Sequence, residues 1–111
     1  MSRQTIYTDV LVVGSGPSGF SAAYTAAKNG AQVIIVEQGG DIGGMSTSGL
    51  MSHWTGSCDS PMYHKILRRS AQKNEGCFYN KITTIIDPEK LKTLYLEMLS
   101  SFLYFKVMIC I

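Results

Sequence analysis

Two short apolar runs dominate the N-terminal half of the chain. Val10–Val13 and Val33–Val36 contain no polar residue and are rich in β-branched side chains. Continuous apolar runs of this length are typical of strands that are buried on both faces of a parallel sheet. Gly14 ends the first run and Glu37 ends the second. The pattern therefore predicts two paired strands of an α/β fold.

The segment between these runs has the composition and spacing of a helix. It extends from about Ser18 to Asn29, and Gly30 follows it. Alanines at helical spacing allow close packing on a sheet, and they are Ala22, Ala23, Ala26 and Ala27. Gly30 is well placed to act as a left-handed C-terminal cap. Strand, helix and strand therefore form one βαβ unit.

A glycine-rich turn, Gly14–Gly19 (GSGPSG), joins the first strand to this helix and matches the GxGxxG pattern. In that pattern the first glycine permits a tight turn, the second lets the backbone approach a diphosphate, and the third lets helix and strand pack closely. Pro17 is tolerated because an early helical position has no intrahelical partner for an amide. Alone, the pattern is equally typical of a plain glycine-rich turn. The strand before it and the helix after it favour a dinucleotide site.

Glu37 is the candidate ribose ligand. It ends the second strand about 20 residues after the first glycine turn, as expected of the acid in such sites. Its carboxylate can accept hydrogen bonds from ribose hydroxyls and would repel a 2′-phosphate, which argues against NADP. The alternative is an ordinary solvated glutamate at a strand end.

A second glycine segment, Gly39–Leu50 (GGDIGGMSTSGL), follows at once. A nicotinamide-binding fold would normally begin a helix here. Instead, this segment can bring backbone amides and the hydroxyl of Ser46 or Thr47 onto the same diphosphate. The alternative is a flexible surface loop.

This order of elements resembles the FAD-dependent oxidoreductases with a glutathione-reductase-like FAD domain. The matching positions are Gly14, Gly16, Pro17, Gly19, Glu37, Gly43, Gly44, Met45, Thr47, Gly49 and Leu50. The resemblance implies a Rossmann-like FAD-binding unit with a parallel sheet, and hydride transfer between a substrate and flavin. The cofactor-binding residues that it implies are Gly14, Gly16, Pro17, Ser18, Gly19, Glu37, Gln38, Gly44, Met45 and Ser46.

The resemblance also divides the chain into a βαβ core (8–50), a helical and loop insertion (51–101) and a terminal strand (104–111). Met51–Asp59 is interpreted as a loop, because it is short and mostly polar. Within it, His53 is a candidate for the surroundings of the flavin. The alternative is an ordinary histidine in a polar loop.

Two further helices are predicted in the insertion. Ser60 and Pro61 have the residue types of an N-cap and a first helical position, and this helix extends to about Lys73, before Asn74–Gly76. Asp87-Pro88-Glu89 starts another helix in the same way. The expected core faces are apolar stripes, formed by Met62, Tyr63, Ile66 and Leu67 in one helix and by Leu91, Leu94, Tyr95 and Met98 in the other.

The remaining patterns predict two strands and a charged helix face. Phe78–Ile86 is predicted to include a strand, and Tyr104–Ile111 to add one beside the second strand of the βαβ unit. A set of basic residues falls largely on the polar side of the first insertion helix, and it consists of Lys65, Arg68, Arg69 and Lys73. A solvated face is favoured over a patch for an anionic ligand.

The composition agrees with one small globular domain. With 45% hydrophobic and 16% charged residues, the 111-residue chain can bury a core. The net charge of +2 gives no reason to expect nucleic acid or a membrane as a partner. The longest apolar run, Phe102–Ile111, is far shorter than a membrane-spanning helix. Cys58, Cys77 and Cys110 fit neither a disulfide framework nor zinc spacing, so no metal is expected and the location is predicted to be cytoplasmic.

The resemblance covers only the N-terminal part of the enzymes in question. We therefore expect a fragment whose partners are FAD, an unidentified small-molecule substrate, and a second chain or domain that completes the fold. Catalytic residues are not assigned. The alternatives are a nucleotide-binding module that holds FAD or NAD without turnover, and a partly folded product that binds nothing.

Overall fold

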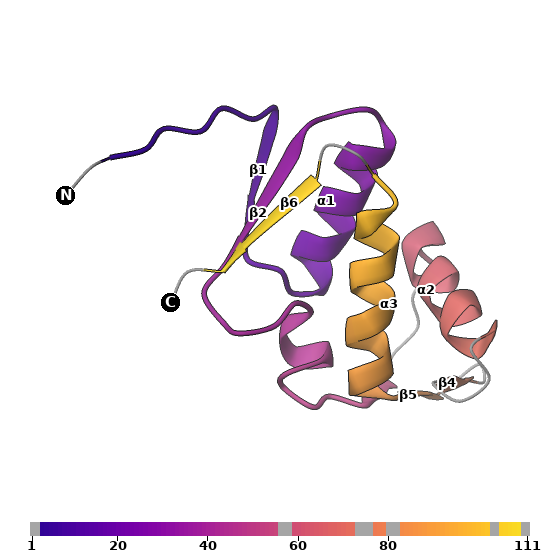
Figure 1. The fold of residues 1–111 in the computed structure, drawn as a ribbon. Coiled ribbons are helices and arrows are strands. Elements are labelled where there is room, and N and C mark those ends of the chain that lie inside the picture. The colour runs from indigo at the N-terminus through magenta and orange to yellow at the C-terminus, as the bar shows by residue number, and fades with distance from the viewer. Residues whose placement is uncertain (1–2, 56–58, 73–76, 80–82, 103–104, 110–111) are drawn as a thin grey trace.

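The computed structural model describes residues 3–55, 59–72, 77–79, 83–102 and 105–109. These residues form two small sheets with helices between and beside them (Figure 1). In chain order the elements are β1 (Val10–Val13), α1 (Pro17–Lys28), β2 (Val33–Glu37), the 3-10 turn η1 (Gly44–Ser46), β3 (His53–Thr55), α2 (Pro61–Gln72), β4 (Cys77–Tyr79), β5 (Thr83–Ile86), α3 (Pro88–Ser100) and β6 (Phe105–Ile109).

The first sheet is parallel and has the strand order β1-β2-β6. Val10 of β1 lies opposite Val33 of β2, and Phe105 of β6 lies opposite Val33 on the other edge. The predicted pair of strands and the predicted third strand beside β2 are both confirmed. Residues 104 and 110–111 of that third strand lie outside the described part of the chain. The Rossmann-like α/β class expected from the sequence is therefore the observed one.

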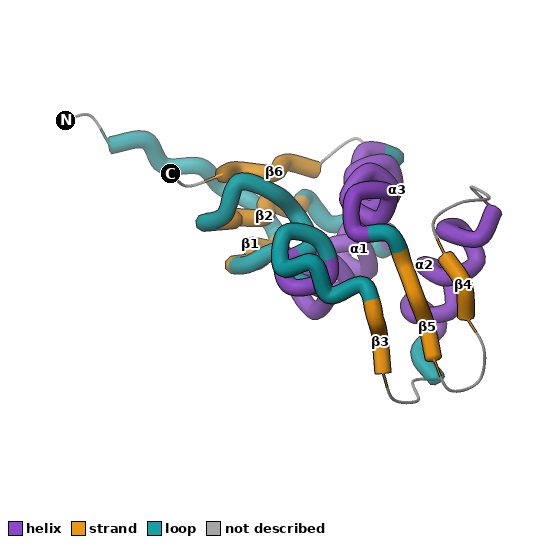
Figure 2. The backbone as a smooth tube through the Cα atoms, turned by 90° about the horizontal axis from the view of Figure 1, so that it is seen from below, coloured by secondary structure: helices purple, strands orange, loops and turns teal. Residues whose placement is uncertain are grey.

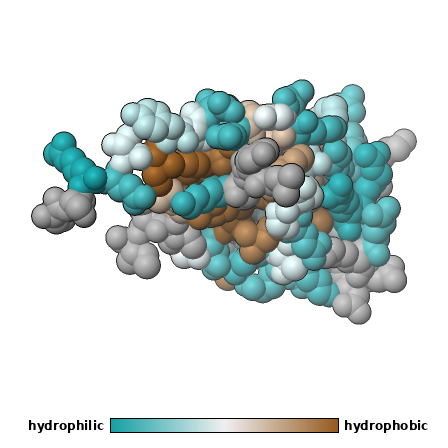
Figure 3. Space-filling view, turned by 45° about the horizontal axis from the view of Figure 1, so that its top comes forward, coloured by the Kyte–Doolittle hydropathy of each residue, from teal (hydrophilic) through white to brown (hydrophobic). Residues whose placement is uncertain are grey.

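The two faces of this sheet differ. Helices α1 and α3 cover one face (Figure 2), where Val12 and Ile35 pack against the core. Leu11 and Val13 point the other way and are 57% and 78% exposed. Figure 3 shows apolar side chains gathered on the surface in the half of the molecule that contains this sheet. The prediction that both strands are buried on both faces is therefore wrong for β1, because no described element covers its second face.

Helix α1 begins and ends one residue earlier than predicted. Its C-terminal signal is confirmed, because Gly30 has φ +92° and its amide donates to the Ala27 carbonyl at 3.0 Å. The small side chains of Ala23 and Ala27 are buried in the core. They let α1 lie close to the sheet and place its N-terminus at the ends of β1 and β2.

Residues 51–101 contain a second, antiparallel sheet with the order β3-β5-β4. The interpretation of Met51–Asp59 as a loop is wrong at His53–Thr55, which forms β3. A three-residue strand gives too little alternation to be recognised, and its partner β5 lies far along the chain. The stretch Phe78–Ile86 includes β5 and most of β4, and residues 80–82 between them lie outside the described part.

Helices α2 and α3 confirm the predicted core stripes, although Met62 and Tyr63 of α2 are only partly buried where they pack against the core. Ile66 and Leu67 of α2 are buried, as are all four stripe residues of α3. Ser60 and Asp87 cap the two helices: the Tyr63 amide lies 3.4 Å from the Ser60 hydroxyl, and Asp87 accepts from the amides of Glu89 (2.9 Å) and Lys90 (3.2 Å). None of the described helices is long and apolar enough to cross a membrane.

The basic residues of α2 do not form one solvated face. Arg68 and Arg69 are exposed as expected. Lys65 instead turns toward α1, where its ammonium lies 3.3 Å from the Tyr24 hydroxyl and 5.0 Å from the centre of that ring. This contact joins α2 to α1 by a cation–π interaction. Lys73 lies outside the described residues.

Candidate cofactor site

The first glycine turn leaves free donors at the start of α1. Gly14 has φ +95°, and its amide donates to the Val36 carbonyl of β2 at 2.8 Å. Gly16 is the N-cap, and the first helical bond runs from the Phe20 amide to the Gly16 carbonyl at 2.8 Å. The amides of Ser18 and Gly19 precede that bond and have no acceptor within the helix. Together with the positive end of the helix dipole, they favour an anion here.

The structural requirement for glycine differs among the three glycine positions of the pattern. A Cβ atom on Gly19 would lie 1.9 Å from the Gly14 carbonyl oxygen, so the turn itself requires this glycine. Gly14 is required by its positive φ. A Cβ atom on Gly16 would meet no protein atom within 4 Å, and its φ of −62° is open to any residue. Nothing in the described chain therefore requires glycine at position 16, and open space lies beside it.

Glu37 lies directly beside this turn. Its Oε2 accepts hydrogen bonds from the Ser15 amide, at 2.8 Å, and from the Ser15 hydroxyl. Its Oε1 accepts from the Gly39 amide at 2.8 Å. The Ser15 hydroxyl, followed by the Gly39 amide, lowers the pKa of this carboxyl below its ordinary value of 4.5. Glu37 is thus held ionised and in one orientation, and its partial exposure leaves lone pairs for further donors.

The second glycine segment packs against the first glycine turn. The Gly43 amide donates to the Ser15 carbonyl at 2.8 Å. Gly44 has φ +55°, and a Cβ atom there would lie 3.0 Å from the Gly16 Cα atom. The two glycine-rich stretches, far apart in sequence, are therefore in direct contact. The prediction that they meet at one place is consistent with this geometry.

Two of the three hydroxyl side chains of the second glycine segment, those of Ser46 and Thr47, point inward. The Ser46 hydroxyl donates to the Gly43 carbonyl at 2.7 Å, and the Thr47 hydroxyl donates to the Ile42 carbonyl. Both side chains are buried, whereas Met45 is 61% exposed. In this arrangement the two hydroxyls shape the segment. The parts of Gly44 and Met45 that remain for a ligand are backbone groups.

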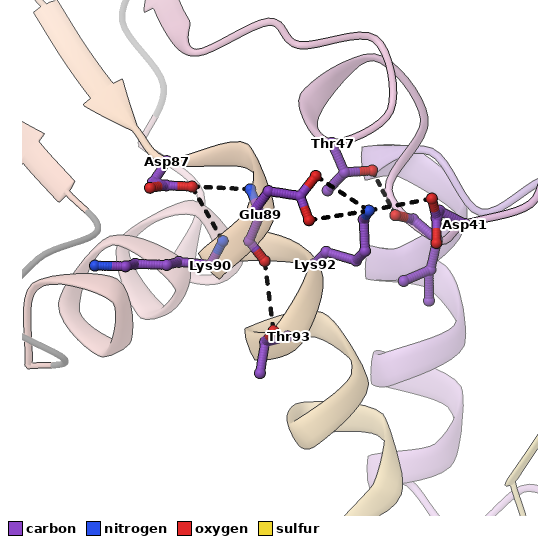
Figure 4. Close-up of polar contacts among 8 residues, drawn as sticks. Asp41, Thr47, Asp87, Glu89, Lys90, Lys92 and Thr93 are labelled. Carbon is purple, nitrogen blue, oxygen red and sulfur yellow. Dashed lines mark hydrogen bonds and ion pairs between the residues drawn. The ribbon is translucent and has the colours of Figure 1, made fainter.

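Helix α3 contacts the start of the second glycine segment through an ion pair. Lys92 lies 3.1 Å from the Asp41 carboxylate and 3.3 Å from that of Glu89. Figure 4 shows its ammonium between the two carboxylates. Both partners raise the pKa of Lys92, Asp41 most of all. Sequence reasoning missed this pair, because the two residues lie about 50 positions apart and no motif assigns a role to either.

Ser15 was also missed, although it stands inside the GxGxxG pattern. That pattern assigns roles to its glycines and treats the intervening residues as free. Ser15 is fully buried and is the chief partner of Glu37. A hydroxyl residue next to the first glycine, with an acid at the end of the second strand, was the available signal.

For His53 and the three cysteines, no described contact with the candidate cofactor site is found. His53 is exposed on β3 and pairs through its backbone with Ile85 of β5. Cys58 and Cys110 lie outside the described residues, as does the side chain of Cys77. Among the described residues, no group of three His, Cys, Asp or Glu side chains is arranged to hold a metal ion. Pro17 and Ser18 are exposed at the first glycine turn, and Gln38 is exposed directly after Glu37.

Comparison with known proteins identifies relatives of this arrangement. The chain is 48% identical over 50 residues to a fumarate reductase (cytochrome) from Shewanella frigidimarina, covering 42% of this chain and 9% of the relative. It is 33% identical over 93 residues to a dihydrolipoyl dehydrogenase from Buchnera aphidicola, covering 80% of this chain and 18% of the relative. The chain thus spans less than a fifth of the length of either relative.

Among solved structures, THI4 from Thermovibrio ammonificans superposes with a TM-score of 0.63 at 25% identity, covering 90% of this chain and 37% of that one. The family model described as FAD dependent oxidoreductase matches residues 9–107. This match includes β1, both glycine-rich stretches and most of β6. It confirms FAD as the expected cofactor, and the chain belongs to the FAD-dependent oxidoreductase family.

Proposed function

We propose that the first glycine turn, Glu37, and Gly44 and Met45 of the second glycine segment bind the ADP half of FAD. The open space beside Gly16 carries the proposal, because nothing in the described chain requires glycine there. Free amides at the start of α1 match an anionic diphosphate. An ionised carboxylate beside them matches the ribose hydroxyls.

Each part of the site has a separate task in this proposal. The amides of Ser18 and Gly19 donate to the diphosphate, and Gly16 lets it approach the backbone. Glu37 accepts hydrogen bonds from the ribose, and Gln38 lies beside it. Gly44 and Met45 close the site from the second glycine segment, with Ser46 holding their turn in shape.

The family supplies the chemistry. Bound FAD exchanges a hydride or electrons with a substrate through its flavin ring. We propose this reaction for the whole protein, with a small-molecule substrate and with a further domain or a second chain around the ring. The division into a core (8–50), an insertion (51–101) and a terminal strand (104–111) belongs to this proposal, as does the cytoplasmic location. A nucleotide-binding module without turnover is the less favoured function, because the family is one of oxidoreductases.

Titration with FAD tests the site. We expect the purified chain to bind FAD, measured by quenching of flavin fluorescence and by a rise in Tm with FAD concentration. Gly16→Ala should fold normally and bind FAD at least tenfold more weakly, because the methyl group occupies the space of the diphosphate. A wild-type chain that leaves flavin fluorescence and Tm unchanged would contradict the proposal.

Gly40→Ala is the matched control. A Cβ atom on Gly40 also meets nothing within 4 Å, and Gly40 has no positive φ, so this substitution makes the same chemical change outside the proposed contacts. We expect wild-type affinity for this variant. Equal losses in Gly16→Ala and Gly40→Ala would mean that the space beside Gly16 is not the ligand site.

A further inference from the structure

Helix α3 reaches the second glycine segment at two successive turns. At the outer edge, Lys92 pairs with Asp41. One turn farther along, Tyr95 is fully buried and neighbours Ser46, the last residue of η1. The first contact is a partly exposed ion pair. The second is a buried phenol, and it has an unusual feature.

The Tyr95 hydroxyl is buried without a hydrogen-bond partner in the described part of the chain. Burial raises the pKa of this phenol, and the neighbouring Ser46 hydroxyl partly offsets that rise. Ser46 is therefore close to Tyr95, but the two hydroxyls do not complete a hydrogen bond. The Ser46 hydroxyl donates to the Gly43 carbonyl, with 2.7 Å between the two oxygens, and the Ser46 oxygen still has lone pairs that can accept.

The Tyr95 ring is fixed from the other side. It stacks on Phe20 of α1 with ring centres 4.0 Å apart and an angle of 20° between the planes. The Phe20 amide makes the first helical bond of α1, to Gly16. Tyr95 thus contacts the first turn of α1 from the core side, and it neighbours Ser46 of the second glycine segment. Its ring cannot turn away to find another partner for the hydroxyl.

Buried hydroxyls in folded proteins are nearly always paired, because an unpaired one loses its hydration without compensation. A phenylalanine would fill the same space without that penalty. A movement that brings an acceptor to the Tyr95 hydroxyl would remove this penalty. Ser46 is the polar side chain whose hydroxyl acts on the pKa of Tyr95, and it belongs to the segment that contacts Gly16.

We propose that Tyr95 is a positioning residue for FAD: its hydroxyl donates to the Ser46 oxygen when the second glycine segment closes on the cofactor. The inference rests on the proposed function, since it requires FAD at the glycine turns. Tyr95 itself does not touch the cofactor. It acts through Ser46, which needs only a small movement because the two hydroxyls are already neighbours.

Tyr95→Phe separates this role from a structural one. We expect the free variant to have a Tm equal to or above that of the wild type, because an unpaired polar group is removed. We expect its Kd for FAD to rise about three- to tenfold, the worth of one hydrogen bond. A lower Tm, or an unchanged Kd, would overturn the inference.

Tyr63→Phe is the control with the opposite expectation. The Tyr63 hydroxyl lies 2.8 Å from the Thr84 hydroxyl, between α2 and β5, so its hydrogen bond is already made. This variant should have a lower Tm and an unchanged Kd for FAD. A rise in Kd as large as that of Tyr95→Phe would also overturn the inference, because both effects would then follow from general loosening.

A double-mutant cycle completes the test. If Tyr95 acts through Ser46, adding Tyr95→Phe to Ser46→Ala should not raise the Kd further. Additive effects would mean that Tyr95 does not act through Ser46. Failure of the wild type to bind FAD would refute the proposed function itself, and that result is distinct from equal binding by the wild type and Tyr95→Phe.

Discussion

Ser15 donates two hydrogen bonds to a single oxygen of Glu37. The backbone amide lies 2.8 Å from Oε2, and the hydroxyl of the same residue donates to that atom as well. Ser15 is fully buried, so its hydroxyl has no competing water. The first glycine turn and the end of β2 are thereby locked together, and the carboxylate is oriented before any ligand arrives. Such preorganisation reduces the cost of ordering a site on binding.

Replacing Ser15 with alanine removes one of these bonds. We expect the free energy of unfolding at pH 7 to fall by about 1–2 kcal/mol, since the lost bond goes to a charged but partly exposed group. Urea unfolding measures this loss. Ser48→Ala is a suitable control, because Ser48 is exposed in the second glycine segment. An unchanged midpoint in both variants would mean that the hydroxyl does not stabilise the turn.

The same substitution should change the response to acid. The pKa of Glu37 is lowered in the folded protein, so its stabilising effect is complete above the ordinary value of 4.5 and is lost as the pH falls through the lower folded value. Ser15→Ala raises the folded pKa toward 4.5. We therefore expect the variant to lose less stability than the wild type between about pH 5 and pH 3. If the stabilities of the wild type and Ser15→Ala fall in parallel with pH, the Ser15 hydroxyl does not lower the pKa of Glu37.

Gly19→Ala should damage the fold, unlike Gly16→Ala. The new Cβ atom would lie 1.9 Å from the Gly14 carbonyl oxygen, which is backbone and cannot rotate away. We expect a loss of about 3 kcal/mol or more in unfolding free energy, despite the better helix propensity of alanine. Thermal unfolding of both variants checks this contrast. Equal Tm values for Gly16→Ala and Gly19→Ala would show that the turn relaxes at little cost.

The sequence predicted the elements whose signals are local. The βαβ unit follows from two apolar runs, a glycine pattern and alanine spacing. Helix α3 follows from Asp87, Pro88 and a stripe of apolar residues. The spacing of Glu37 placed its carboxylate beside the first glycine turn, as observed. Each of these signals can be recognised in one short, continuous stretch of the sequence.

The missed features depend on contacts between distant residues. Strand β3 exists because β5, about 30 residues later, pairs with it. The exposure of Leu11 and Val13 depends on which elements cover the sheet, and an apolar run cannot report that. Lys92 and Asp41 meet only after α3 packs beside α1. Composition around each residue contains none of this information.

The N-cap of α3 provides a test of the fold away from the site. Asp87 accepts from the amides of Glu89 and Lys90, and it lies at the positive end of the helix dipole (Figure 4). Asp87→Ala should cost about 1 kcal/mol, or about 4–8 °C in Tm for a small domain. Asp87→Asn, which retains the acceptor, should recover most of the loss. If both variants melt together, the charge rather than the hydrogen bonds stabilises the helix.

Replacing Glu37 with glutamine tests the carboxylate with almost no change of shape. The two oxygens accept from two different backbone amides, those of Ser15 and Gly39, both at 2.8 Å. A glutamine has one oxygen and one NH2 group, so either orientation sets a donor against a donor. We expect a loss of about 1–3 kcal/mol at pH 7, measured by urea unfolding.

The loss in Glu37→Gln should also depend on pH. Below the folded pKa of Glu37, the wild type carries a protonated carboxyl and has itself lost the second strong acceptor. The stabilities of wild type and variant should therefore converge as the pH falls below about 4.5. Glu89→Gln is the matched control, because that carboxylate is exposed and pairs with Lys92 without accepting from two backbone amides. It should change stability far less at pH 7, since exposed ion pairs are weak. Similar losses in the two variants would mean that the amides of Ser15 and Gly39 do not set the requirement for a carboxylate at position 37.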